Sequence, residues 1–204
     1  MEIIYNCEEI DKLCKDSNFQ LIKVCLLGID STGKSSFLNR IFNRNKFDNF
    51  KKSIQGIIPN ISSQFYRILV KYKGKLFKLE IWDTAGQLKF FSLNKIFYKE
   101  ANVILNFYDP FKKESFEYIK NCLKGVNELN STFLCICILI KNKYDLNEAK
   151  DKKIIISDEE VLEYADKNNL SFRNLSNLEK YGSGIEEIIE DCINGYLNKN
   201  NKNL

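Results

Sequence analysis

Along this chain, short apolar runs alternate with longer segments in which apolar residues recur at helical spacing. The short runs are bounded by polar residues, which is typical of buried strands, and they cover residues 21–28, 102–109, 133–142 and 170–176. The helical segments cover residues 34–44, 112–129, 157–169 (with Ser157 as the N-cap) and 184–199. Because strands and helices alternate, we expect an α/β fold with a mostly parallel sheet.

Two further segments complete the predicted sheet and its connections. Residues 64–83 form two apolar runs around Lys73-Gly74, which predicts a β-hairpin. Residues 46–63 are polar and irregular, so we expect a loop there. The prediction is a three-layer arrangement with helices on both faces of a six-stranded sheet, in which one edge strand is antiparallel.

The start of the chain carries a different pattern. Ile3, Cys7, Ile10 and Cys14 stand at helical spacing, with acidic residues early and lysines late. We therefore divide the chain into an amphipathic helical extension at 1–18, one domain at 19–198 and a frayed tail at 199–204.

Composition narrows the class of protein. The chain has 204 residues, 44% of them hydrophobic and 28% charged, which suits one globular domain. The net charge of +4 is spread along the chain, so we expect no nucleic-acid partner. The seven cysteines are odd in number and no apolar signal segment precedes them, so we expect the reducing cytoplasm.

The stretch GIDSTGKSS at residues 28–36 carries the first candidate chemistry. Gly28 and Gly33-Lys34-Ser35 fit the phosphate-loop pattern between a predicted strand and a predicted helix. Lys34 can reach the β- and γ-phosphates of a nucleotide, and the Ser35 hydroxyl can hold Mg²⁺. We expect further nucleotide contacts from the rest of the loop and the helix start: Asp30, Ser31, Thr32, Gly33 and Ser36.

The stretch IWDTAGQ at residues 81–87 ends an apolar strand. Asp83 can hold Mg²⁺ through a water molecule, and the backbone N–H of Gly86 can approach a γ-phosphate. Gln87 can orient an attacking water. We therefore take Gln87 and Lys34 as candidate catalytic residues, and Ser35 and Asp83 as candidate metal ligands.

The stretch NKYD at residues 142–145 follows another buried strand. The Asp145 carboxylate can accept two hydrogen bonds from the N1–H and 2-amino groups of guanine, which adenine does not offer. Asn142 can bind the base and the neighbouring loops, and the stem of Lys143 can lie along the ring. Ser176, after the last predicted strand, is a further candidate for the base pocket.

These three stretches, in this order, resemble the small GTPases of the Ras superfamily over about residues 20–198. The stretch KLEIWDTAGQLKF is most similar to the Rab branch. The resemblance implies a Ras-like P-loop domain and a switch between GTP-bound and GDP-bound states, with Mg²⁺ as cofactor. It also implies an exchange factor, a GTPase-activating protein and effectors as partners, often in vesicle traffic.

The chain departs from the Rab pattern in the phosphate loop. Rab and Ras proteins usually carry Gly or Ser where Asp30 stands, and Gly where Ser31 stands. The Arf branch has an Asp at the first of these positions. The chain therefore resembles Arf proteins in this loop and Rab proteins in DTAGQ.

The first switch is the second departure. The family places a Thr there that binds Mg²⁺ and the γ-phosphate. Counting back from Asp83 by the Rab spacing gives Asn60, whose N–H and carbonyl oxygen are a different ligand set. Ser53 is the competing candidate because it stands at the usual distance from Lys34.

The C-terminus is the third departure, since the last cysteine is Cys192 and no prenylation or myristoylation signal is present. We expect a monomer without a lipid anchor, cytoplasmic, that reaches an endomembrane only through partners.

Three hypotheses for function follow. The first is a GTPase switch that hydrolyses GTP slowly without an activating protein. The second is a nucleotide-bound scaffold with negligible hydrolysis, which Asp30 and the missing switch Thr favour. The third is an ATPase or kinase that uses only the phosphate loop. This hypothesis assigns no function to the NKYD stretch.

Overall fold

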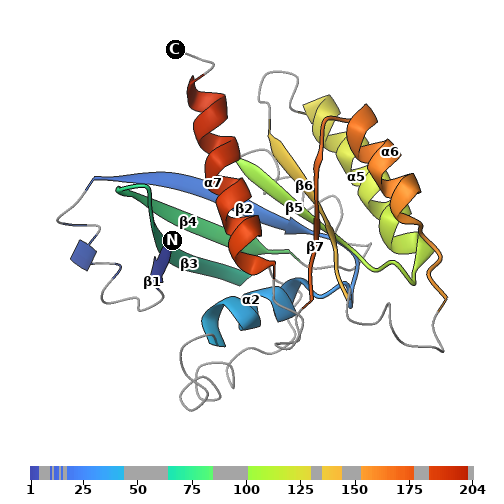
Figure 1. The fold of residues 1–204 in the computed structure, drawn as a ribbon, viewed down its shortest axis with the longest axis horizontal. Helices are drawn as coiled ribbons and strands as arrows, with labels where there is room; N and C mark the ends of the chain where they lie inside the picture. The colour runs from blue at the N-terminus through green and yellow to red at the C-terminus, as the bar shows by residue number, and fades with distance from the viewer. Residues whose placement is uncertain are drawn as a thin grey trace.

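The computed structural model describes residues 1–4, 10, 12, 13, 15, 18–43, 64–84, 101–129, 135–143, 153–176 and 184–201. Within these residues, seven strands form one sheet in the order β1-β3-β4-β2-β5-β6-β7 (Figure 1). The strands are β1 (Glu2–Ile4), β2 (Phe19–Leu27), β3 (Gln64–Tyr72), β4 (Lys75–Asp83), β5 (Val103–Tyr108), β6 (Ile136–Lys141) and β7 (Ser171–Asn174).

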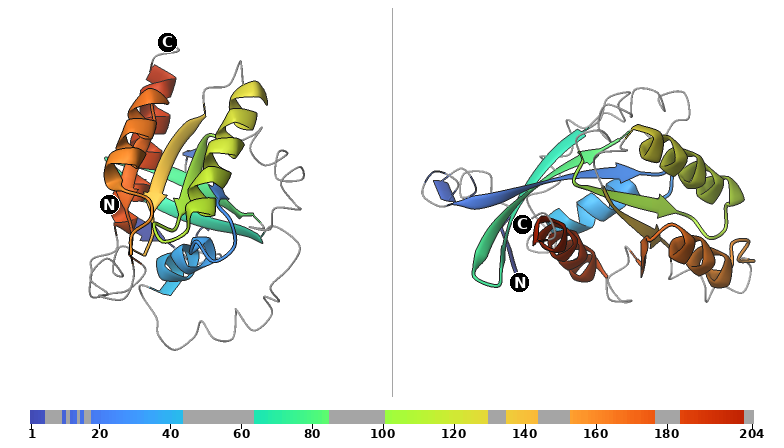
Figure 2. Two further views of the ribbon diagram at one scale, coloured as in Figure 1. Left: turned by 90° about the vertical axis from the view of Figure 1, so that its right-hand side faces the viewer. Right: turned by 90° about the horizontal axis from the view of Figure 1, so that it is seen from above.

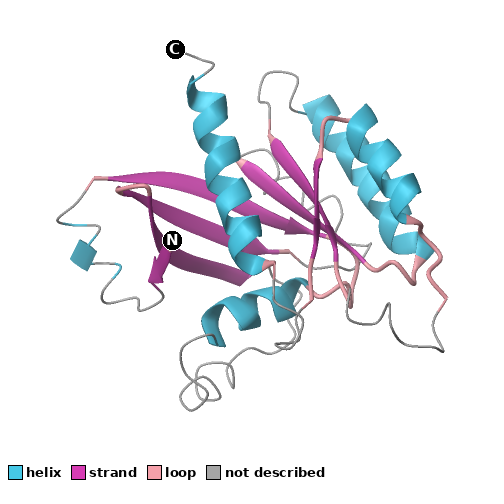
Figure 3. Cartoon of the chain, viewed as in Figure 1, coloured by secondary structure: helices cyan, strands magenta, loops and turns pink. Residues whose placement is uncertain are grey.

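The direction of the strands confirms a mostly parallel sheet. β4, β2, β5, β6 and β7 are paired in parallel, as expected for strands linked by helical crossovers. β3 pairs antiparallel with β4, and β1 pairs antiparallel with β3. The α/β class, the antiparallel part and the alternation along the chain are therefore as predicted (Figure 3).

The start of the chain corrects the expected strand count. Glu2–Ile4 form a strand against Leu69–Lys71 instead of a helix, so the sheet has seven strands and β1, not β3, is its antiparallel edge. The physical reason is that an uncovered β3 edge offers unpaired backbone groups, and pairing with them outweighs a weak local helical pattern. Residues 10, 12, 13 and 15 are helical, and the rest of 5–17 lies outside the described residues.

The predicted hairpin joins β3 to β4 through Lys73 and Gly74. Both residues have positive φ, +48° and +74°, which is the backbone of the two-residue turn that suits twisted strands. The hairpin is fixed to the last helix, because the Tyr72 hydroxyl donates to Asn194 Oδ1 at 3.3 Å.

Four helices in the described part of the chain cover the two faces of the sheet. They are α2 (Lys34–Asn43), α5 (Lys113–Leu129), α6 (Asp158–Lys167) and α7 (Ile185–Asn201). α2 and α7 lie on one face, and α5 and α6 lie together on the other (Figure 2). Ser157 caps α6 as predicted, since its side chain accepts the Glu160 N–H at 3.2 Å.

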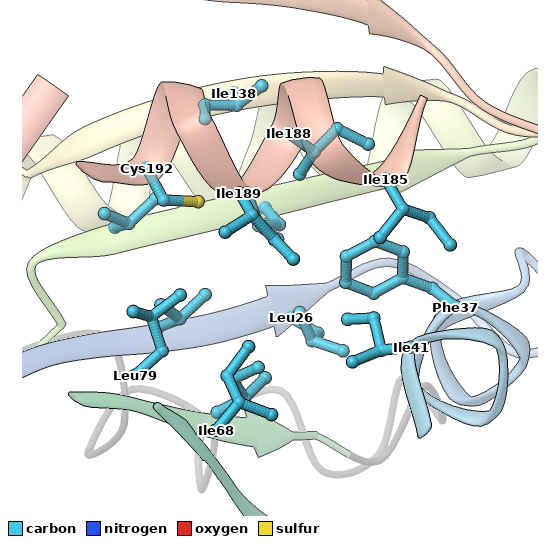
Figure 4. Packing of buried hydrophobic residues seen from close by; sticks show 14 of the residues in the cluster. Leu26, Phe37, Ile41, Ile68, Leu79, Ile138, Ile185, Ile188, Ile189 and Cys192 are labelled. Atoms are coloured by element: carbon cyan, nitrogen blue, oxygen red, sulfur yellow. The ribbon is translucent and has the colours of Figure 1, made fainter. Parts of the chain in front are cut away.

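The largest apolar core lies between the sheet and the helices α2 and α7. Phe37 and Ile41 of α2 and Ile188 of α7 are buried against alternate residues of the strands (Figure 4). On the opposite face, Phe116 of α5 and Val161 of α6 belong to a second buried cluster. Both faces of the parallel strands are thus covered, which leaves the ends of the strands as the place where polar side chains gather.

No helix in the described part of the chain is long and apolar enough to span a membrane.

Candidate functional site

The candidate site lies at the carboxyl ends of the parallel strands. β2 ends at Leu27, directly before the glycine loop, and α2 begins at Lys34 on the other side of that loop (Figure 1). Asp83 is the last residue of the neighbouring β4, and Asn142 follows β6. Parallel strands end at the same edge, so the described parts of the three sequence motifs meet there.

The backbone of the glycine loop requires its first glycine. Gly28 has φ +149°, and a Cβ atom at this position would stand 2.4 Å from the backbone oxygen of Phe107. Gly33 has φ +95°, and its carbonyl oxygen accepts the Phe37 N–H of α2 at 2.9 Å. The Thr32 hydroxyl donates to the Ile29 oxygen at 2.8 Å, which closes the turn between the glycines. The loop is therefore a tight turn at the start of a helix.

Lys34 reaches back over this loop. Its ammonium donates to the backbone oxygens of Gly28 at 2.6 Å and Ile29 at 3.0 Å. Only 6% of the residue is exposed, and this burial lowers the pKa of the ammonium, although the nearby charges of Asp83 and Asp30 raise it. A buried cation held by neutral carbonyl oxygens favours an anionic ligand, which would restore the solvation it has lost.

Ser35 and Asp83, the two candidate metal ligands in the described part of the chain, are joined by a hydrogen bond. The Ser35 hydroxyl donates to Asp83 Oδ2 at 2.6 Å, whereas Asp83 Oδ1 is buried without any hydrogen-bond partner. Burial raises the pKa of the Asp83 carboxyl, against the lowering effects of the Ser35 bond and Lys34. A hydroxyl and a carboxylate with a free buried oxygen fit Mg²⁺, which takes one or two protein oxygens together with phosphates and water.

In the described residues no group of three or more His, Cys, Asp or Glu side chains could hold a metal ion by itself.

Asn142 and Lys143 connect the end of β6 to the rest of the site. The Asn142 amide donates to the backbone oxygen of Thr32 at 2.6 Å, so the NKYD stretch is tied directly to the glycine loop. Lys143 has φ +60°, and its ammonium lies 2.5 Å from Asp109 Oδ2. Ser176 is buried just beyond β7, next to Leu175, whose N–H donates to the Lys141 oxygen of β6 at 2.8 Å.

Comparison with known proteins assigns this arrangement to a family. Residues 23–198 match the sequence model of the Ras family. The chain belongs to the Ras family. It is a GTP-binding small GTPase, and the predicted superfamily and its span along the chain are confirmed.

The relatives of this Ras-family chain include Rab proteins, which confirms the predicted resemblance to the Rab branch. It is 35% identical over 179 residues to the Ras-related protein Rab-4 of Dictyostelium discoideum, covering 88% of this chain and 80% of that protein. It is 32% identical over 169 residues to the mouse Ras-related protein Rab-21, covering 83% and 70%. It is 32% identical over 194 residues to the GTP-binding protein YPT52 of Saccharomyces cerevisiae, covering 83% and 79%.

Several predicted site residues of this small GTPase lie outside the described residues: Ser53, Asn60, Gly86, Gln87 and Asp145. The described ones are brought together at one sheet edge, in the glycine loop from Gly28 to Gly33, at Lys34, Ser35 and Ser36, and at Asp83, Asn142, Lys143 and Ser176.

Two residues of the site were missed by the sequence analysis. The Thr84 hydroxyl donates to the Leu26 oxygen at 2.6 Å, which ties the segment after β4 to β2. Asp109, after β5, receives the Lys143 ammonium. A polar residue directly after an apolar strand was the available signal for Asp109, and it is the same signal that identified Asp83.

Proposed function

We propose that this Ras-family protein is a Rab-like switch that binds GTP and GDP with Mg²⁺, hydrolyses GTP slowly and regulates vesicle traffic. The observation that carries the proposal is the hydrogen bond from Asn142 to the backbone oxygen of Thr32, because it joins the candidate base site to the candidate phosphate site. A site that joins a base-binding part to a phosphate-binding part fits a nucleoside phosphate better than an isolated phosphate loop does.

On the phosphate side we assign Lys34 to the β- and γ-phosphates. The loop N–H groups and the N-terminus of α2 would stabilise the remaining negative charge of the phosphates. Ser35 and Asp83 would hold Mg²⁺, with Asn60 as the proposed switch ligand. The bound ion would neutralise charge that develops on the phosphate oxygens. Gly86 and Gln87 are assigned to the γ-phosphate and the attacking water.

On the base side we assign Asp145 to the two guanine donors, with Asn142, Lys143 and Ser176 around the ring. The first experiment identifies the nucleotide that copurifies with the protein and compares its affinities for GTP and ATP. We expect guanine nucleotide and a strong preference for GTP. Equal affinity for ATP would refute the assignment of Asp145.

The rate of GTP hydrolysis distinguishes a GTPase switch from a nucleotide-bound scaffold with negligible hydrolysis. Single-turnover GTP hydrolysis should be slow but measurable, and Gln87→Ala should reduce it, since the side chain orients water. A rate that is indistinguishable from zero in both proteins would instead favour the scaffold. The family's activating protein would typically add roughly 10³–10⁵-fold to a competent enzyme.

Two variants test whether Asn60 or Ser53 is the metal ligand of the first switch. Asn60→Thr should raise the Mg²⁺-dependent affinity for GTP, because a hydroxyl replaces an amide oxygen at the metal. If Asn60→Thr has no effect and Ser53→Ala weakens binding, the loop has been aligned wrongly. The cellular role is proposed by relation to Rab proteins: an exchange factor, an activating protein and effectors as partners, and action at an endomembrane surface.

A further inference from the structure

Asp109 is a buried carboxylate whose position is fixed by elements outside the three sequence motifs. Only 3% of its side chain is exposed. Its backbone N–H donates to Ser115 Oγ of α5 at 3.0 Å, and its backbone oxygen accepts the Lys112 N–H at 3.0 Å. Its Oδ1 accepts the Phe111 N–H at 3.0 Å, which forms an Asx-type turn into α5.

The second carboxylate oxygen of Asp109 points to the base side of the site. Oδ2 lies 2.5 Å from the ammonium of Lys143, which is 30% exposed. The two residues follow adjacent parallel strands, whose last paired residues are Tyr108 and Lys141. The backbone between them is also joined, because the Asn142 N–H donates to the Tyr108 oxygen at 3.1 Å.

Lys143 needs such an anchor more than an ordinary surface lysine does. Its backbone has φ +60°, a conformation that costs a non-glycine residue energy, and its side chain has many rotamers of similar energy. A charge-assisted bond to a fixed carboxylate selects one of them. The Lys143 stem is thereby held in place before a base arrives, which lowers the entropy lost on binding.

We propose that Asp109 is a positioning residue for nucleotide binding, which acts by holding the ammonium of Lys143 so that its stem lines the base pocket. The proposal rests on the proposed function of the site. The competing explanation is that Asp109 serves only the turn into α5. The two roles use different carboxylate oxygens, and Asp109→Asn separates them, because the amide oxygen can still accept the Phe111 N–H while the charge is lost.

The test is a double-mutant cycle on GDP dissociation, measured with a fluorescent GDP analogue on the full chain. Asp109→Asn should speed dissociation about 5-fold, since a charge-assisted bond becomes a neutral one. Lys143→Met keeps much of the stem but leaves the Asp109 carboxylate buried without its cation, and should speed it about 10-fold or more. In the Lys143→Met background, Asp109→Asn should give no further acceleration, because its partner is absent.

The matched control is Asp158→Asn, which removes the carboxylate from another ion pair at the end of β6. Asp158 Oδ1 lies 2.6 Å from the buried ammonium of Lys141. This variant should lower stability while GDP dissociation stays within about 2-fold of the parent, since the pair that it breaks joins β6 to α6.

If Asp109→Asn leaves GDP dissociation unchanged in the parent, Asp109 serves the turn alone, and if it speeds dissociation equally in both backgrounds, it does not act through Lys143; either result overturns the proposal. If Asp158→Asn has as large an effect as Asp109→Asn, loss of any ion pair at this strand end suffices and the proposal is also overturned. A parent chain that binds no guanine nucleotide would refute the proposed function instead, so the two failures are distinguishable.

Discussion

Gly28→Ala tests whether the start of the glycine loop is fixed by packing rather than by local sequence. The added Cβ would stand 2.4 Å from the Phe107 oxygen and 2.8 Å from Thr32 Oγ1, where ordinary contacts begin at 3.4 Å. The Phe107 oxygen belongs to β5 in the centre of the sheet, so the loop would have to move by about 1 Å. The Gly28 φ of +149° adds a strain of about 1–3 kcal/mol for alanine.

Overpacking of this kind usually costs another 1–3 kcal/mol or so, so the middle of the two ranges gives a total of about 4 kcal/mol. In a domain of this size, that lowers the melting temperature by about 8–16 °C. Nucleotide binding should weaken as well, because the Gly28 oxygen holds the Lys34 ammonium. The assay is thermal and urea unfolding of the nucleotide-free protein, followed by GDP binding.

Gly74→Ala is the matched control. Gly74 also has a positive φ, +74°, but an added Cβ there would meet nothing within 4 Å. Its cost is therefore the backbone strain alone, about 1 kcal/mol, with no loss of binding. The difference between the two variants isolates the contact with Phe107. If Gly28→Ala is no more destabilising than Gly74→Ala, the packing argument for the loop is wrong.

Three further predictions concern Ser31, Asp83 and the pairing of β1 with β3. Ser31 has φ +64°, so Ser31→Gly should stabilise the protein by about 0.5–1 kcal/mol in urea unfolding; a loss of stability would contradict the strain. Burial raises the pKa of Asp83, so the metal-free protein should lose stability as the pH rises above about 4. Asp83→Asn should remove this dependence and weaken Mg²⁺-dependent GTP binding, whereas an unchanged pH profile would exclude Asp83 as its source. Removal of residues 1–4 should speed hydrogen exchange at Leu69–Lys71, which pair with β1, more than at Gln64–Ile68, which pair with β4 only among the described strands.

Local signals predicted most of the fold. The hairpin turn at Lys73-Gly74 and the Ser157 cap are each determined by a few neighbouring residues, and both were found from the sequence. β1 was not, because Glu2–Ile4 become a strand only when β3 offers its edge, and β3 lies far away in the sequence. Long-range pairing of this kind leaves no periodic trace in a three-residue segment.

The same distinction applies to the site. Lys34, Ser35 and Asp83 were predicted because their motifs have fixed local spacing, and the structure brings them together. Asp109 was missed because its partner, Lys143, follows a different strand, and only the pairing of β5 with β6 makes them neighbours. The strain at Ser31 was also invisible, since a serine in a loop has no required sign of φ until the loop is built.

Asp30 places a carboxylate in a loop that is proposed to bind phosphates. The residue is exposed, so water screens its repulsion of a phosphate to the order of 1 kcal/mol or less. Its attraction raises the pKa of Lys34, against the lowering caused by burial. Asp30 therefore helps to keep the Lys34 ammonium charged, and a charged ammonium is what an incoming phosphate requires. Because the two effects oppose each other, the Asp30 carboxylate is compatible with nucleotide binding.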